Sequence, residues 1–67
     1  MSDILEQLSE LRMQRGISIR SLAEKTGYNI SNLSLIEQGK RQPQLDTLIK
    51  ILDALDAELV IRKRDGE

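Results

Sequence analysis

The sequence predicts a compact all-α domain of four to five helices followed by a short C-terminal β-strand. The chain has 67 residues, which is enough for one small domain with a regular fold. Apolar residues recur at intervals of three and four from Ile4 to Leu55, the spacing of one helix face. Gly16, Gly27 and Gly39 divide this region, because glycine adopts without strain the left-handed backbone that ends many helices.

The first three helices follow from these glycines and the residues after them. The first is expected over residues 3–15, whose apolar positions share one face. Ser18 and Asn29 each follow a glycine by two positions, and both residue types cap helix N-termini by accepting a hydrogen bond from a backbone amide. They predict two short helices, over 19–26 and 30–38.

The fourth helix is expected over 45–55, after a polar loop that contains Pro43. Its apolar stripe covers nearly half of its surface, which is wider than one packing partner requires. Such a stripe indicates two neighbours, one of which can come from a second subunit. The stripe consists of Leu45, Leu48, Ile49, Ile51, Leu52 and Leu55.

Residues 57–63 favour a strand, because they are aliphatic and partly β-branched; a continuation of the fourth helix is the alternative. An isolated strand cannot satisfy its own backbone hydrogen bonds, so we expect it to pair with the identical strand of a second subunit. The chain is thus divided into a helical domain, 1–56, and a dimerisation segment, 57–67. The expected dimer contacts are Ile51, Leu55, Leu59, Val60 and Ile61.

The composition argues against several classes of function. The chain has no cysteine and no histidine, so disulfides, thiolate metal sites and the commonest general base are absent. We therefore expect no enzyme, no metal site and no cofactor. The longest apolar run, Leu59 to Ile61, is too short for a membrane span, and the N-terminus does not resemble a signal peptide. A cytoplasmic protein is expected.

The charges are unevenly distributed along the chain although they nearly cancel. The net charge is −1, whereas residues 12–41 carry six basic and two acidic side chains. A central basic block can produce a positive field on one side of the molecule, which suits a nucleic-acid partner. A mixed, solvated surface explains the charges equally well, so local structure must decide.

Residues 19–38 fit a helix-turn-helix, in which the second of two short helices can lie in the major groove of DNA. Ala23 is small where the two helices cross, and Gly27 allows a positive φ in the turn. A helical hairpin that binds nothing is the alternative. The positions where the pair meets the core are apolar: Leu22, Leu33 and Ile36.

A set of motifs over residues 4–55 carries a family resemblance. The motifs are Leu8-Ser-Glu-Leu11-Arg12, Arg15-Gly16-Ile17-Ser18, Leu22-Ala23-Glu24-Lys25, Gly27, Leu33, Ile36-Glu37-Gln38-Gly39-Lys40 and the series Pro43, Leu45, Leu48, Ile51, Leu55. With them the chain resembles the lambda-repressor/Cro-type helix-turn-helix family, also called the Xre family. The resemblance implies a lambda-repressor-like DNA-binding domain that usually acts as a dimeric transcriptional repressor.

The outward face of helix 30–38 carries candidate base contacts. With its apolar side inward, the helix turns Ser31, Ser34 and Leu35 outward, and this face has no charge. Serine can bond to several bases, and leucine or isoleucine can contact a thymine methyl group. The resemblance implies base contacts at these three residues and at Ile30, where the family commonly has glutamine.

Five polar residues near this helix are candidate phosphate contacts, which position a protein without reading sequence. Asn29 and Asn32 lie at its start, where backbone amides favour an anion. Lys40 and Arg41 lie in the loop that follows. Arg20 begins the preceding helix. For each of them a plain surface role is the alternative.

Arg12 and Glu37 lie on the inward sides of their helices by the same phasing. The resemblance implies that they form a buried salt bridge between the first and third helices. Burying both charges is costly unless they bond to each other. We assign this pair to structure rather than to DNA.

Two functional hypotheses follow. The first is a sequence-specific DNA-binding transcriptional regulator, a dimeric repressor that reads a palindromic operator in double-stranded DNA. The second is an antitoxin that also neutralises a toxin protein, because the tail from Leu55 to Arg62 is similar to that of HipB-like antitoxins, which pair with HipA-type kinases. The two roles are compatible, and neither requires a membrane.

Overall fold

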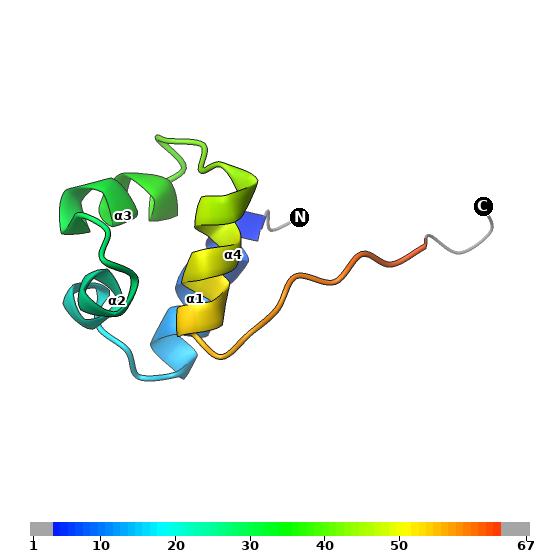
Figure 1. Ribbon diagram of the computed structural model, residues 1–67, viewed down its shortest axis with the longest axis horizontal. Coiled ribbons are helices and arrows are strands. Elements are labelled where there is room, and N and C mark those ends of the chain that lie inside the picture. Colours follow the sequence, from blue (N-terminus) through cyan, green and yellow to red (C-terminus); the bar gives the residue numbers. More distant parts are fainter. Residues whose placement is uncertain (1–3, 64–67) are drawn as a thin grey trace.

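The computed structural model describes residues 4–63, and within them the chain forms four helices (Figure 1). These are α1 (Ile4–Gln14), α2 (Ile19–Thr26), α3 (Ile30–Glu37) and α4 (Leu45–Ala54). Helix α2 packs against α3 and α4, and α3 also packs against α1. The predicted helices are confirmed, with ends that agree to within one residue. None of the helices in the described residues is long and apolar enough to cross a membrane.

The ends of α2 and the start of α3 are fixed by the predicted caps. Ser18 Oγ accepts a hydrogen bond from the Ser21 amide at 3.0 Å, which caps α2. Gly27 ends α2 with φ at 79°, and its amide donates to the Ala23 carbonyl at 2.8 Å. Asn29 Oδ1 accepts from the Ser31 amide at 2.8 Å and caps α3. Local sequence therefore sets both ends of α2 and the start of α3.

The core lies between the four helices and consists of leucine and isoleucine. Its members include Leu5 and Leu8 from α1 and Leu48 and Leu52 from α4. Because α2 and α3 bury only a narrow inner stripe each, their outer faces remain available for other contacts. The most deeply buried side chains are Leu22, Leu33, Ile36, Ile51 and Leu55.

Most of the broad stripe of α4 is covered by this chain's own helices, which corrects the expectation that Ile51 and Leu55 contact a second subunit. Ile51 is 1% exposed and Leu55 is 0% exposed. The phase of α4 turns these two residues into the core and leaves Leu45 and Ile49 at the edge of the stripe, exposed. The sequence gives the width of the stripe correctly but does not tell which part of it faces solvent.

The segment 57–63 forms neither a helix nor a strand in the described part of the chain. Asp56 takes φ of 56°, and the Ala57 amide donates to the Leu52 carbonyl at 2.9 Å, so the chain turns away after α4. The longer-helix alternative is therefore wrong. The segment runs outward from the helices (Figure 1), and within residues 4–63 it forms no ladder with another strand. The expected strand is thus not formed by the single chain.

Gln44 offers a test of the capping analysis. It occupies the N-cap position of α4 with an extended backbone, but its side chain makes no capping hydrogen bond. We expect Gln44→Ser to raise the free energy of unfolding by about 1 kcal/mol, because the hydroxyl can accept from an amide of the first turn. Urea denaturation measures the change. Gln44→Ala adds no acceptor and is the control; an equal gain in both variants would contradict the capping explanation.

Candidate nucleic-acid interface

Helix α3 has an inner side that packs against the core and an outer side that carries the predicted base contacts. Leu33 and Ile36 are each 1% exposed and anchor the inner side. Ile30 and Ser31 are exposed, whereas Ser34 and Leu35 are half-buried. The structure brings the four predicted base contacts onto one side of α3: Ile30, Ser31, Ser34 and Leu35.

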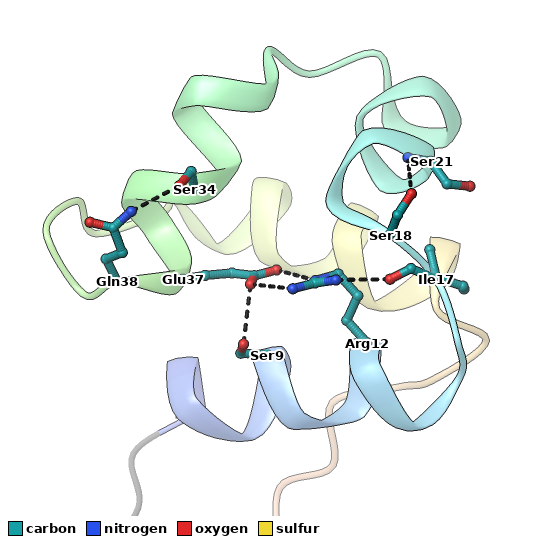
Figure 2. A network of polar contacts seen from close by, with 8 residues as sticks. All are labelled: Ser9, Arg12, Ile17, Ser18, Ser21, Ser34, Glu37 and Gln38. Carbon is teal, nitrogen blue, oxygen red and sulfur yellow. Dashed lines mark hydrogen bonds and ion pairs between the residues drawn. The ribbon is translucent and has the colours of Figure 1, made fainter.

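Ser34 is held by a neighbour that the sequence analysis did not include among the contacts. Gln38 Nε2 donates to Ser34 Oγ at 2.8 Å, as Figure 2 shows. The Gln38 amide also donates to the Ser34 carbonyl at 3.0 Å. Side chains four residues apart on a helix face each other, so the spacing of the two residues is the signal that could have revealed this contact.

Of the two predicted phosphate contacts at the start of α3, Asn32 is bonded to the loop that follows the helix and Asn29 caps the helix. Arg41 Nη1 donates to Asn32 Oδ1. This bond keeps the Arg41 guanidinium beside the N-terminal turn of α3, where the helix dipole is positive. An arginine has five N–H donors, so most of this group stays able to bind a phosphate. Asn29 Oδ1 is used in the cap, which leaves its NH₂ group to donate.

Arg20 and Lys40 flank the outer side of α3 from two directions. Arg20 lies in α2 and lines a shallow hollow together with Ile30, so a predicted phosphate contact and a predicted base contact adjoin. Lys40 is exposed just after Gly39, whose φ is 77°. The Lys40 amide donates to the Leu35 carbonyl at 2.9 Å, which fixes the path of the loop as it leaves α3.

Arg12 and Glu37 form the ion pair that joins α1 to α3 (Figure 2). Arg12 Nε lies 2.7 Å from Glu37 Oε2, and Nη2 lies 3.1 Å from Oε1. Arg12 Nη1 donates to the Ile17 carbonyl at 2.9 Å, and Ser9 Oγ donates to Glu37 Oε1 at 3.1 Å. The side chains are 16% and 10% exposed, so the charges are largely removed from water but fully hydrogen-bonded to each other and to their neighbours.

The turn between α2 and α3 is held by three contacts that the sequence analysis missed. Thr26 is 4% exposed; its hydroxyl donates to the Leu22 carbonyl at 2.9 Å and accepts from the Tyr28 amide at 3.2 Å. Lys50 Nζ lies 5.2 Å from the centre of the Tyr28 ring, within the range of a cation–π contact. The turn is thereby tied to α2 on one side and to α4 on the other, which orients the start of α3.

Comparison with known families identifies the architecture. The helix-turn-helix family model HTH_3 matches residues 8–61. The chain belongs to this family. Over 47 residues the domain is 47% identical to the HTH-type transcriptional regulator PuuR of Escherichia coli, a match that covers 70% of this chain and 25% of PuuR. The chain thus spans about a quarter of the length of this relative.

Two solved structures share the fold of this helix-turn-helix domain. The restriction-modification controller protein C.AhdI of Aeromonas hydrophila has a TM-score of 0.77 and 35% identity, covering 81% of this chain and 82% of that chain. The clp gene regulator ClgR of C. glutamicum has a TM-score of 0.79 and 27% identity, covering 82% and 70%. The family resemblance predicted from the sequence is therefore confirmed.

The ion pair leads to a prediction about the stability of this helix-turn-helix domain. We expect Arg12→Ala or Glu37→Ala to lower the free energy of unfolding by about 3 kcal/mol, because each leaves a mostly buried charge without its partner. The double variant should lose less than the two single losses combined, which a urea-denaturation cycle measures. Arg15→Ala, at an exposed arginine just after α1, is the control and should change little. Simple additivity would contradict a direct interaction.

Proposed function

We propose that the domain binds double-stranded DNA sequence-specifically and regulates transcription, with α3 in the major groove. The observation that carries the proposal is the uncharged outer side of α3 between flanking basic groups. Ile30 and Ser34 lie on that side, while Arg20, Lys40 and Arg41 surround it. Uncharged side chains of this kind can bond to base edges or contact thymine methyl groups, and basic groups beside them can bind the phosphates. The names of PuuR and ClgR, both of them regulators, support the same function.

In the proposed complex the serines and the aliphatic side chains divide the reading of the bases. Ser31 and Ser34 would bond to base edges, and Ile30 and Leu35 would contact thymine methyl groups. Arg20 lies near Ile30 at the N-terminus of α3, the positive end of the helix dipole. It would hold a phosphate there and fix the register of α3 on the DNA. This arrangement places affinity mainly in the basic groups and sequence preference mainly in α3.

We also propose that two copies associate through the segment 57–63 and that the dimer reads a two-fold symmetric operator. Such a dimer would repress transcription by occupying the operator. Leu59, Val60 and Ile61 are exposed, at 42%, 64% and 96%. Their backbone amides and carbonyls could form an antiparallel pair with the same segment of a second copy. Apolar contacts would come from a groove between α1 and this segment, in place of the buried Ile51 and Leu55. The groove is lined in part by Ile4, Leu8, Leu11, Leu59 and Val60.

No specific observation favours the antitoxin alternative. The segment that suggested it forms no strand within residues 4–63, and none of the three similar proteins described above is named as an antitoxin. A toxin partner and a cytoplasmic location both stay predictions.

The DNA-binding proposal is tested by selecting binding sites from a random duplex library and then comparing two variants on the selected sequence. We expect Arg41→Ala to weaken binding to all sequences and to reduce the slope of log affinity against log salt by roughly one unit, because one phosphate contact is lost. We expect Ser34→Ala to change the preference at one base pair instead. Arg15→Ala removes the same charge at a group bonded to the Asp56 carbonyl, away from α3, and is the control. A library that yields no enriched sequence would refute the proposal.

The dimer proposal is tested with a single substitution at a side chain that the protomer does not need. Ile61 is 96% exposed, so Ile61→Asp cannot disturb the core. We expect it to convert a dimer into a monomer in sedimentation experiments and to reduce a footprint of two half-sites, with centres about 34 Å apart, to weak protection of each. Ile61→Val keeps the apolar contact and should stay dimeric. A wild-type chain that sediments as a monomer, or an Ile61→Asp variant that stays dimeric, would refute this interface.

A further inference from the structure

The hydrogen bond between Gln38 and Ser34 has a defined direction. Gln38 Nε2 is the donor and Ser34 Oγ is the acceptor, at 2.8 Å. The backbone amide of Gln38 is bonded to the Ser34 carbonyl, so the two residues are joined at both main chain and side chain. Gln38 occupies the C-cap of α3 with φ of −78° and ψ of −5°, which holds its Cα beside the last turn. The helix end therefore holds the start of the Gln38 side chain next to Ser34, and the bond to Oγ places its amide group.

The direction of this bond restricts what the Ser34 hydroxyl can do. A serine hydroxyl has one proton to donate and two lone pairs to accept with, and an unconstrained serine can bond to donors or acceptors on any base. When an amide N–H occupies one lone pair of Oγ, the hydroxyl proton turns away from Gln38 and is left for another acceptor, while only one lone pair remains, which biases the hydroxyl toward donation. In the major groove guanine presents two acceptors, N7 and O6, whereas cytosine presents an amino donor.

We propose that Gln38 is a positioning residue that makes Ser34 a hydrogen-bond donor and so gives the domain a preference for guanine over cytosine on the strand that Ser34 faces. The inference rests on the proposed DNA-binding function. Gln38 acts through the serine and contacts no base in this scheme. Base recognition by α3 would therefore also depend on Gln38, which lies just beyond the end of the helix and makes Ser34 a donor.

The test measures the relative affinities of the whole chain for two operators. They differ only by the exchange of G·C for C·G at one base pair, the one at which the Ser34→Ala variant loses the preference shown by the wild type. We expect the wild type to prefer guanine roughly tenfold, as one hydrogen bond gained and one unpaired donor avoided would give. Gln38→Ala should reduce this ratio to about twofold, since the hydroxyl can then rotate. Gln38→Glu should invert it, because a carboxylate accepts the serine proton and turns a lone pair of Oγ to the base.

Matched controls separate a positioning role from a direct or structural one. Gln14→Ala removes an exposed glutamine at the end of α1 and should leave the ratio unchanged. In a Ser34→Ala background, Gln38→Ala should have no further effect on the ratio. Thermal unfolding of each variant checks that a change in the ratio does not arise from a loss of folded protein.

Three outcomes would overturn the inference. An equal effect of Gln38→Ala with and without Ser34 would show that Gln38 reads the base itself. A stronger guanine preference in Gln38→Ala would show that the amide is turned the other way. An unchanged ratio in Gln38→Ala would show that the bond has no effect on recognition. A wild type that selects no sequence at all refutes the proposed function instead, and this inference with it.

Discussion

The ion pair between Arg12 and Glu37 is the contact on which the placement of α3 depends. The core side chains of α3 would pack about as well if the helix rotated or slid slightly, because hydrophobic burial has little directional preference. A guanidinium that bonds to a carboxylate through two nitrogens permits one geometry only. The third nitrogen bonds to the Ile17 carbonyl, so the same group also fixes the turn that leads into α2. One arginine thus relates three parts of the chain.

This pair contributes more to the choice of structure than to its stability. Removing two charges from water costs several kcal/mol, which their mutual attraction only roughly offsets. The Ser9 hydroxyl completes the bonding of Glu37 Oε1 and lowers that cost. A 67-residue chain buries a limited apolar area, and its core has leucine and isoleucine but no phenylalanine or tryptophan to add to it. We infer that directional polar contacts supply the precision that such a small aliphatic core does not.

The parts of the structure that depend on local sequence could be predicted, and those that depend on the path of the chain could not. Ser18, Gly27 and Asn29 act within four residues of themselves, so the caps of α2 and α3 were readable. The meeting of Arg12 with Glu37 followed from helix phase together with the family resemblance. The bond from Arg41 to Asn32 depends on how a loop folds back, and no periodicity encodes that. The segment 57–63 is a different case: a strand is a property of two backbones and one chain supplies only one of them, so the pairing of this segment stays a prediction.

The two side-chain bonds around α3 suggest how recognition can change while the fold stays the same. Glu37 faces inward and forms the ion pair with Arg12, so the residues on the outer side of α3 are not needed to hold the helix in place. Asn32 links this side to the charge of Arg41, and Ser34 links it to Gln38. In the proposed complex, a substitution at Ser34 or Gln38 would therefore alter base preference without removing a phosphate contact, whereas a substitution at Asn32 would weaken binding to all sequences, because it removes one phosphate contact and releases the arginine that forms another. Sequence preference and affinity therefore depend on different side chains around α3 and can change separately.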